Sequence, residues 1–444
     1  MFKKVLIANR GEIAVRAIRA CRELGIKTVA IYSEADKNSL HVELADEAIC
    51  IGPPKPSESY LDIPRIMAAL EVSKADAVYP GYGFLSENPK FAEIVERSGA
   101  KFIGPSSEVL RKIGDKVYAK KVAKKVGLPV VPGSEDPVDF AEALRVAQEI
   151  GYPVVIKAAA GGGGRGIRII HNEKDLREKF LVAQKEAEVA FGDGRLYVEK
   201  YIINPKHIEF QIVADERGNI TCLGERECSI QRRHQKLIEE APSVALSEEK
   251  RKEICEKVVE FCRELGYTSV GTVEFLMDEE GNLYFIEMNG RIQVEHPVTE
   301  MITGIDLVKA QILAAAGEEV KFEEVKTNGW AIEFRINAED PNTFIPSPGI
   351  IEKLILPGGP GVRVDTHVYQ GYAIPPHYDS LIAKIIVWGR TREEAIARAK
   401  RALGETVIEG KNLRTNLEFH LRVLNHKEFI EGKHDITFID RMTV

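Results

Sequence analysis

The sequence predicts a mixed α/β and α+β protein built from three parts. An alternation of strand, helix and strand opens the chain, and it indicates a doubly wound α/β domain over residues 1–114. A compact unit with a glycine-rich turn follows within residues 115–203. From residue 204 to 444 the strands become longer and tight turns separate them, which favours a large, mostly antiparallel α+β domain. A chain of 444 residues suits about three domains at roughly 150 residues each.

The N-terminal domain is predicted from its first thirty-odd residues. Val5–Ala8 is an apolar run of the kind found in buried strands, and residues 13–24 carry apolar side chains at helical spacing. Gly25 stands where a helix commonly ends in a left-handed residue. Residues 28–32 then form the second strand, so we expect a parallel sheet with helices on its faces.

The central unit is predicted to contain two linker helices and a small sheet. Residues 115–150 are expected to form helices around a proline-rich connector. Strands are then expected at 153–157, 167–170 and 196–200, with a charged helix at about 173–190.

Composition limits the classes of function and the location. The net charge is −7, which argues against a protein held on nucleic acid by bulk charge. No stretch approaches the roughly 18 uncharged apolar residues of a membrane-spanning helix, and the N-terminus shows no signal peptide, so we expect a cytoplasmic protein. The six cysteines form no C-x-x-C pair, and we expect them to be reduced thiols rather than a zinc site.

A run of glycines in the central unit predicts a phosphate-binding turn. Gly161–Gly164, Arg165 and Gly166 match the dinucleotide pattern G-x-G-x-x-G, but a strand follows them instead of a helix, and they lack the G-K-[ST] of a P-loop. Such a turn between antiparallel strands can offer backbone N–H groups to phosphates, with Arg165 and the nearby Lys157 adding charge. The alternative is a flexible hairpin tip.

The segment from Glu287 to His296 alternates polar and largely apolar residues in the manner of a strand. Its polar row is Glu287, Asn289, Arg291, Gln293 and Glu295. An edge strand with a solvated face is the alternative, although that row lacks Lys, Thr and Ser. Fully extended, Glu287 and Glu295 would stand about 26 Å apart, so we expect the chain to bend after about Arg291 if one site uses both.

Two carboxylates are predicted to meet across a hairpin. Glu274 lies on the strand that precedes the turn leading to Glu287, and the two could stand side by side. Paired carboxylates with no neutralising lysine suggest Mg²⁺ that bridges nucleotide phosphates. Charged hairpin ends exposed to water are the alternative.

A cationic cluster runs from Gln231 to Lys236 and includes His234. Taken alone it could be a solvated loop or a nucleic-acid patch. In an acidic chain with a phosphate turn and a carboxylate pair, a local anion site is the more economical interpretation. Arg335 is a further guanidinium predicted on a strand.

These segments, in this order, resemble the biotin carboxylase family, which belongs to the ATP-grasp enzymes. The resemblance extends from residues 5–14 to 378–380, essentially the whole chain, and its most specific motifs are residues 81–88, 231–236 and 287–297. It implies an ATP-grasp fold in three parts, with an N-terminal doubly wound domain, a small lid over ATP and an antiparallel C-terminal part.

The resemblance also implies a role for individual residues. ATP would be held by Lys116, Lys157, Gly161, Gly162, Gly163, Gly164, Arg165, Gly166, Glu199, Lys200, Ile202, His207, Gln231 and His234. Glu274, Glu287 and Asn289 would bind Mg²⁺ or Mn²⁺. Bicarbonate would contact Lys236, Arg291, Gln293, Val294 and Glu295, and biotin would contact Tyr82 and Arg335. Lys236, Arg291, Glu295 and Arg335 would be catalytic, with Glu295 as the general base.

The implied activity is carboxylation of biotin through carboxyphosphate, the first half-reaction of acetyl-CoA carboxylase. The same half-reaction for pyruvate carboxylase or another acyl-CoA carboxylase is the nearest alternative, and another ATP-grasp ligase is more distant. A Rossmann dehydrogenase or a nucleotide sensor belongs to a different class, and the turn at Asn9–Glu12 lacks its glycine fingerprint.

The implied partners are a biotin carboxyl carrier protein, a carboxyltransferase and a second copy of the chain. Biotin is expected on the separate carrier, because none of the six methionines adjoins a lysine. The resemblance places Arg19, Glu23 and Arg363 at a two-fold interface. Two residues depart from the family pattern. Many relatives carry a residue with a Cβ at the position of Gly290, and the glycine would loosen this strand. Pro360 is the second departure and lies near the position associated with the dimer contact.

Overall fold

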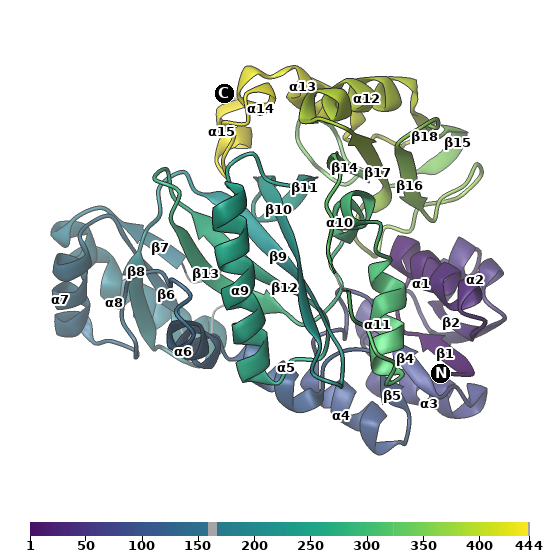
Figure 1. The fold of residues 1–444 in the computed structure, drawn as a ribbon, viewed down its shortest axis with the longest axis horizontal. Helices are drawn as coiled ribbons and strands as arrows, with labels where there is room; N and C mark the ends of the chain where they lie inside the picture. Colours follow the sequence, from purple (N-terminus) through teal and green to yellow (C-terminus); the bar gives the residue numbers. More distant parts are fainter. Residues whose placement is uncertain (159–166, 323, 443–444) are drawn as a thin grey trace.

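The structure is a computed structural model that describes residues 1–158, 167–322 and 324–442. Its N-terminal part is a five-stranded parallel sheet in the order β3-β2-β1-β4-β5, with helices on its faces, which confirms the doubly wound prediction (Figure 1). The elements are β1 (Lys4–Ile7), α1 (Gly11–Glu23), β2 (Lys27–Ser33), α2 (Leu40–Leu44), β3 (Glu47–Gly52), α3 (Ile63–Ser73), β4 (Ala77–Tyr79), α4 (Pro89–Arg97) and β5 (Lys101–Phe102).

The central unit protrudes from the rest of the molecule, at the left of Figure 1. Its antiparallel sheet has the order β7-β6-β8. Asn172 caps the long helix α8 by accepting the N–H of Asp175, and Gly192 ends it in a left-handed conformation. The predicted turn, Gly161–Gly166 with Arg165, lies outside the described residues. The elements are α5 (Ser107–Gly114), α6 (Lys116–Lys125), α7 (Phe140–Ile150), β6 (Val154–Ala158), β7 (Ile167–Ile170), α8 (Glu173–Phe191) and β8 (Leu196–Lys200).

The third part is organised around an eight-stranded antiparallel sheet in the order β13-β12-β9-β10-β11-β14-β17-β16. A two-stranded sheet, β15-β18, lies beside it, and α12–α15 cover its upper end in Figure 1. The elements are β9 (Lys206–Ala214), β10 (Ile220–Arg232), β11 (Gln235–Ala241), α9 (Glu248–Leu265), β12 (Ser269–Met277), β13 (Leu283–Asn289), α10 (His296–Thr303), α11 (Leu307–Ala315), β14 (Trp330–Asn337), β15 (Ile350–Ile355), β16 (Val362–Thr366), β17 (Leu381–Gly389), α12 (Arg392–Glu405), β18 (Val407–Lys411), α13 (Leu417–Asn425), α14 (Lys427–Ile430) and α15 (Phe438–Met442).

The N-terminal and large domains share their apolar cores. One buried cluster joins Phe91 of α4 and Phe102 of β5 to Phe210 and Phe275 of the large sheet. The small central unit has a separate core of its own. The first and third parts therefore pack as one body, to which the central unit is attached by α6 and the chain around residues 201–205.

The predicted bend is present, and it begins at Gly290 instead of after Arg291. β13 ends at Asn289 and α10 begins at His296. A Cβ at Gly290 would lie 2.5 Å from Cδ1 of Ile113 on α5. A side chain at this position would therefore require the ends of the Ile113 and Leu110 side chains to shift, and the N–H of Gly290 donates to Glu87 at 2.9 Å.

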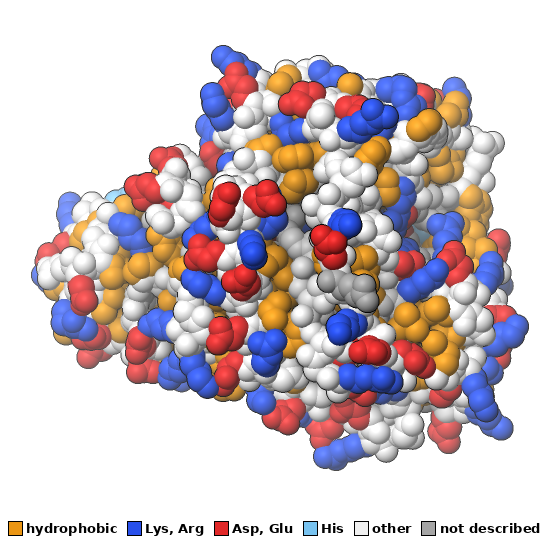
Figure 2. Space-filling view, in the orientation of Figure 1, with side chains coloured by type: hydrophobic (Ala, Val, Ile, Leu, Met, Phe, Trp, Pro, Cys, Tyr) orange, Lys and Arg blue, Asp and Glu red, His pale blue; other side chains and the backbone are white. Residues whose placement is uncertain are grey.

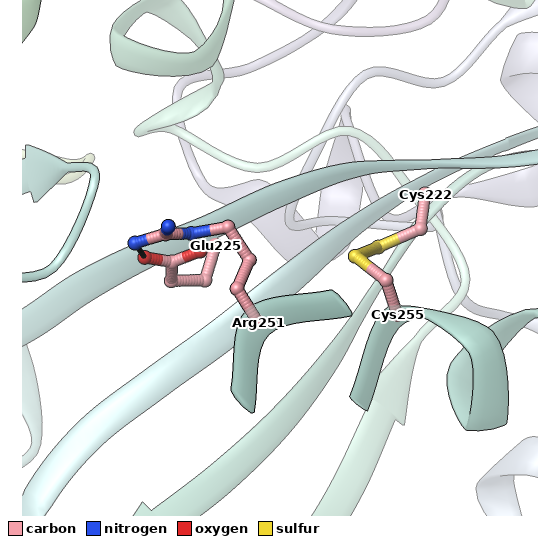
Figure 3. Close-up of a disulfide and its surroundings, with 4 residues drawn as sticks. All are labelled: Cys222, Glu225, Arg251 and Cys255. Carbon is pink, nitrogen blue, oxygen red and sulfur yellow. Dashed lines mark hydrogen bonds and ion pairs between the residues drawn. A yellow bond between two sulfur atoms is a disulfide. The ribbon is translucent and has the colours of Figure 1, made fainter. Parts of the chain in front are cut away.

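The prediction that all six cysteines are reduced is wrong. Cys222 on β10 and Cys255 on α9 form a disulfide with a Cα–Cα distance of 5.5 Å (Figure 3). In the same region Arg251 of α9 donates to both oxygens of Glu225 on β10, at 2.6 and 2.8 Å. The pairing depends on α9 crossing β10, which residue spacing does not reveal. The four remaining cysteines are free.

Charge is mixed over the surface. On the face drawn in Figure 2, acidic and basic side chains are interspersed, with no extended patch of one sign among the atoms described. Within the same described part of the chain, none of the helices has the length and apolar character needed to cross a bilayer.

Candidate active site

A cavity of about 1690 Å³ lies where the three parts meet. It is lined by every predicted site residue that the structure describes, namely Tyr82, Lys116, Lys157, Glu199, Lys200, Ile202, His207, Gln231, His234, Lys236, Glu274, Glu287, Asn289, Arg291, Gln293, Val294, Glu295 and Arg335. The cavity therefore brings together motifs that lie up to about 250 residues apart in the sequence.

The two predicted metal carboxylates are neighbours. Glu274 on β12 is the register partner of Glu287 on β13. The amide of Asn289 donates to Oε1 of Glu274 at 2.9 Å. Each carboxylate also has a lysine neighbour, Lys236 at 3.0 Å from Glu274 and Lys116 at 3.2 Å from Glu287, so the expectation of a pair without a neutralising lysine is wrong. Two carboxylates and an amide form the all-oxygen donor set that suits Mg²⁺ or Mn²⁺, so these residues fit the ion.

Glu274 is ionised in spite of its burial. Burial raises the pKa of this carboxyl, but Lys236 and His207 overcome that effect and hold the pKa well below its ordinary value. Nε2 of His207 lies 3.1 Å from Oε2 of Glu274, outside hydrogen-bonding geometry. The carboxylate is thus in the form that a cation requires.

Lys236 occupies the centre of the polar end of the cavity. Its Nζ contacts Glu209 at 2.6 Å, Glu295 at 2.8 Å, Glu274 at 3.0 Å and Gln293 at 3.2 Å. Burial lowers the pKa of this ammonium, yet the three carboxylates raise it well above its ordinary value. The group is a fixed cation with four oxygen neighbours.

Glu295 lies between two cations. Its second oxygen accepts from Arg335 at 3.0 Å, while its first contacts Lys236. Burial raises the pKa of Glu295, but Lys236 and Arg335 lower it far below its ordinary value. Glu295 is therefore a firmly ionised carboxylate.

Arg291 is turned toward the N-terminal domain. Its Nε donates to Glu87 at 2.9 Å, and its NH2 group donates to Asn289 at 3.0 Å. Its guanidinium lines the cavity without a direct contact to Glu295 among the described interactions. No local pattern indicates the Glu87 contact, because 204 residues separate the pair.

The nucleotide end of the cavity is formed by the lid and the strands beside it. Glu199 accepts from Lys157 at 2.5 Å and from Lys120 at 2.9 Å. Burial raises the pKa of Glu199, and these lysines bring it below its ordinary value. Lys200 donates to the carbonyls of Gly151 and Tyr152, which leaves its aliphatic stem beside the cavity.

A strained turn carries part of the cationic cluster into the cavity. Arg233 and His234 connect β10 to β11, and both have positive φ values, 50° and 66°. Asn-Gly usually occupies such a turn, since a side chain is disfavoured there. Two large side chains held in this conformation at a cavity wall indicate a functional constraint. Gln231, just before the turn, contacts Nδ1 of His207 at 3.2 Å.

The predicted biotin residues lie at the far side of the polar end. The Tyr82 hydroxyl donates to Glu12, which also lies 3.2 Å from Nζ of Lys384. Lys384 in turn donates to the carbonyl of Val294 at 2.7 Å. Burial and Glu12 raise the pKa of the Tyr82 hydroxyl well above its ordinary value, so it remains a hydrogen-bond donor.

Several residues that shape the site were not predicted from the sequence. They include Glu209, Glu12, Lys384, Ile436 and Thr437. Ile436 and Thr437 line the cavity from the C-terminal end of the chain. Glu209 could have been found, because its strand runs opposite Glu274 and repeats a polar residue at every second position. The others depend on packing between distant segments.

Behind Arg335 lies a pair of buried carboxyl groups. Glu239 on β11 and Glu333 on β14 are register partners, both 0% exposed. Arg335 donates to Glu239 at 2.6 Å, whereas neither oxygen of Glu333 has a hydrogen-bond partner. Burial raises the pKa of Glu239 to about 7, and burial raises that of Glu333 well above its ordinary value. Burial thus favours the protonated, neutral form of the Glu333 carboxyl.

Comparison with known proteins accounts for the whole chain. Three family models match it: "Biotin carboxylase, N-terminal domain" over residues 1–110, "Carbamoyl-phosphate synthase L chain, ATP binding domain" over 115–323, and "Biotin carboxylase C-terminal domain" over 333–441. The chain is 55% identical to biotin carboxylase of Haemophilus influenzae, covering 99% of both chains. It is 54% identical to a pyruvate carboxylase subunit of Methanothermobacter thermautotrophicus, over 99% of this chain and 90% of that one.

A solved structure has the same fold. The crystal structure of the biotin carboxylase domain dimer of 2-oxoglutarate carboxylase from Hydrogenobacter thermophilus, in complex with MgADP, ADP and bicarbonate, is 52% identical. It superposes with a TM-score of 0.92 over 99% of this chain and 98% of that one. This agreement confirms the predicted ATP-grasp fold. Full-length identity above 50%, the matching domain models and the shared fold together establish that the chain belongs to the biotin carboxylase family.

Proposed function

We propose that this protein uses ATP and bicarbonate to carboxylate biotin, which a separate biotin carboxyl carrier protein presents. The observation that carries the proposal is the contact of Lys236 with both Glu295 and Glu274, since it joins an anion site to a metal site in one cavity. A ligase that activates bicarbonate with ATP needs the two sites next to each other.

The nucleotide is assigned to the lid side. Lys116 and Lys157 are positioned to contact phosphates, as the glycine turn is expected to do. Ile202 and the stem of Lys200 offer an apolar wall for adenine. Glu199, His207, Gln231 and His234 complete this end of the cavity. In this proposal residues 115–203 form the lid, while residues 1–114 and 204–444 form the base.

Glu274, Glu287 and Asn289 would hold Mg²⁺ or Mn²⁺. When bound, the ion would offset the charge of the phosphates. At the polar end of the cavity the chain itself provides two fixed cations, Lys236 and Arg335, for the bicarbonate anion. We assign bicarbonate to Lys236, Arg291, Gln293, the Val294 backbone and Glu295.

Glu295 is the general base in this proposal. It takes the proton of bicarbonate, and a carbonate oxygen attacks the γ-phosphorus of ATP as the bond to ADP breaks, which gives carboxyphosphate. Its low pKa is due to Lys236 and Arg335. A bound anion shares the charge of these cations, so the pKa of Glu295 rises when bicarbonate arrives.

Biotin is assigned to the side of Tyr82 and Arg335. Carboxyphosphate breaks to CO₂ and phosphate, the phosphate takes the ureido proton, and N1 of biotin forms its bond to CO₂. Arg335 lies next to Glu295 at 3.0 Å and can stabilise the ureido anion that this proton transfer leaves.

The final acceptor is determined by the partner carboxyltransferase. Relatives of 54–55% identity are named for biotin carboxylase, pyruvate carboxylase and 2-oxoglutarate carboxylase, and all of them need the same half-reaction. We propose acetyl-CoA as the first candidate, with pyruvate or another acceptor as the alternative. We also propose a homodimer, supported by the dimeric relative from Hydrogenobacter thermophilus.

The decisive experiment measures ATP hydrolysis by the purified protein. We expect it to require bicarbonate and to accelerate with free biotin. Hydrolysis that is independent of bicarbonate, or a rate unchanged by biotin, would contradict the proposal. A streptavidin blot after coexpression with a biotin ligase should leave this chain unlabelled and label its carrier.

A further inference from the structure

The C-terminal end of the chain returns to the nucleotide end of the cavity. Residues 431–437 lie between α14 and α15 in neither helix nor strand, and Ile436 and Thr437 line the cavity. The N–H of Ile436 donates to the carbonyl of Pro205 at 3.0 Å. Pro205 ends the short link, residues 201–205, that joins β8 of the lid to β9 of the large sheet.

A buried ion cluster holds this segment in place. Nζ of Lys206 donates to the carbonyls of Gly432 and His434, at 3.0 and 2.5 Å, and pairs with Glu227 at 2.8 Å. The ring of His434 is 2% exposed, and its Nε2 lies 3.1 Å from the same carboxylate. Glu227 thus ties both Lys206, at the start of β9, and His434 to the strand β10.

A second cation holds the chain just before this segment. Arg392 of α12 donates to the carbonyls of Phe429 and Ile430, both at 2.8 Å, and pairs with Glu240 at 2.7 Å. Glu240 also lies 3.6 Å from Nε2 of His434. Because the segment has no helical or sheet ladder, side-chain anchors of this kind help to hold Ile436 and Thr437 in place, together with the hydrogen bonds of Thr437 to Asp435 and Asn204.

The cluster could serve only to stabilise the fold. Its position argues for an additional role. His434 lies two residues before Ile436. Its carboxylate partner, Glu227, also pairs with Lys206, the residue that follows the lid link. Glu227 thus anchors both residues 431–437 and the end of the lid link. This shared anchor holds the wall formed by Ile436 and Thr437 in a fixed position relative to the lid.

We propose that His434 is a positioning residue for nucleotide binding, which it serves by holding Ile436 and Thr437 against the lid link. The proposal rests on the assignment of this end of the cavity to ATP. Among the described contacts, His434 touches neither the polar end of the cavity nor any residue assigned to bicarbonate, so its effect should be confined to the nucleotide.

The test compares H434A with H434Q and K433A. H434A should raise the KM for ATP and the Kd for MgATP, measured by calorimetry without bicarbonate, by roughly tenfold, the scale of one hydrogen bond to a charged group. The KM for bicarbonate should stay within about twofold. H434Q, which can still donate to Glu227, should recover most of the affinity. K433A removes only an exposed ion pair with Glu431 and should behave as the wild type.

A purely structural role would lower the melting temperature and the active fraction of H434A but leave its Kd for MgATP unchanged, and that result would overturn the proposal. If H434A does not fold, the Kd for MgATP of H434Q compared with that of the wild type, together with the following exchange measurement on the wild type, tests the proposal. Exchange of the Ile436 amide in the wild type should slow when MgATP binds, and unchanged exchange would contradict the proposal. Failure of the carboxylase assignment itself would appear separately, as MgATP binding without bicarbonate-dependent hydrolysis.

Discussion

Nζ of Lys236 lies 2.8 Å from Oε1 of Glu295 and thereby connects the proposed base to the proposed metal carboxylate Glu274, which the same ammonium contacts at 3.0 Å. The two halves of the site thus share one cation. A substitution at Lys236 should disturb both halves, whereas a substitution at Glu295 should disturb one.

E295Q should lower kcat by roughly 10²–10⁴-fold, the contribution typical of a general base. Its KM for ATP should stay within about twofold, because no nucleotide residue contacts Glu295 in the part of the chain that the structure describes. K236Q should lower kcat and also lower the Mg²⁺ concentration needed for half-maximal rate, since Glu274 loses the ammonium that neutralises it and competes with the metal ion. Steady-state kinetics with Mg²⁺ and bicarbonate varied separately would check both variants. Equal kinetic profiles for E295Q and K236Q would contradict the shared-cation account.

E274Q and E287Q should both raise the Mg²⁺ requirement, by about tenfold or more, a range that even outer partners of metal ligands reach. They should differ in their effect on bicarbonate. Glu274 is tied to Lys236 and Gln293, so E274Q should also raise the KM for bicarbonate. Glu287 contacts Lys116 and should leave that KM unchanged. E279Q, in the exposed turn of the same hairpin, is the matched control. An effect of only one of the two on Mg²⁺ would show that the register pair does not bind the ion jointly.

Local patterns in the sequence were sufficient for the main strands and helices and for the polar part of the cavity wall around Glu274, Glu287 and Glu295. The period-two row beginning at Glu287 and the hairpin pairing of Glu274 with Glu287 follow from strand geometry, which acts over a few residues. The family resemblance supplied the assignment of residues such as Lys116 and Tyr82, which no local pattern singles out.

The rest depends on contacts between distant segments. The Glu87 carboxylate on Arg291, the Lys384 ammonium on Val294 and the Cys222–Cys255 bond join positions whose spacing carries no periodic signal. A bend after about Arg291 was expected from the length of the polar row, but the chain bends at Gly290, where Ile113 of another helix packs close to the backbone. Packing between elements, and not local propensity, fixes such features.

The disulfide between Cys222 and Cys255 should stabilise the large domain. It closes a loop of 33 residues, for which chain entropy gives about 3–4 kcal/mol of unfolding free energy. Denatured, unreduced protein should react with a thiol reagent at four cysteines and at six after reduction, since four are free. C222S should lower the melting temperature and keep kcat, because neither cysteine lines the cavity in the described structure. C50S, which removes an exposed free thiol, is the control. Six reactive thiols before reduction would contradict the bond.

The proposed dimer makes a separate prediction. Within one chain Glu23 pairs with Lys309, and Arg363 pairs with Glu300 at 2.6 Å and Asp365 at 2.7 Å. These residues, with Arg19, would have to serve an interface in addition to their internal contacts. Sedimentation at micromolar concentration should give twice the chain mass of 49.4 kDa. A monomer at that concentration would refute the interface.

The buried carboxyl group of Glu239 should make stability depend on pH in a defined window. Burial raises its pKa from 4.5 to about 7, with the carboxylate Glu295 adding to the effect and Arg335 opposing it. A raised pKa means that the folded state holds the proton more tightly, so the stability due to this group is complete below pH 4.5. It is lost as the pH rises through about 7, and it amounts to up to about 3 kcal/mol at 1.36 kcal/mol per pKa unit.

E239Q keeps a neutral group of the same shape that cannot titrate. We expect the wild type and E239Q to unfold at similar urea concentrations at pH 5, and E239Q to be the more stable of the two at pH 8, because the wild type must then hold a buried carboxylate. The ion pair with Arg335 is already included in the pKa, so its loss in the variant does not reverse the sign. E279Q, exposed on its turn, should show no such divergence. Parallel stability curves for the wild type and E239Q from pH 5 to 8 would show that Glu239 does not titrate in this range, and that Arg335 faces a permanently charged carboxylate.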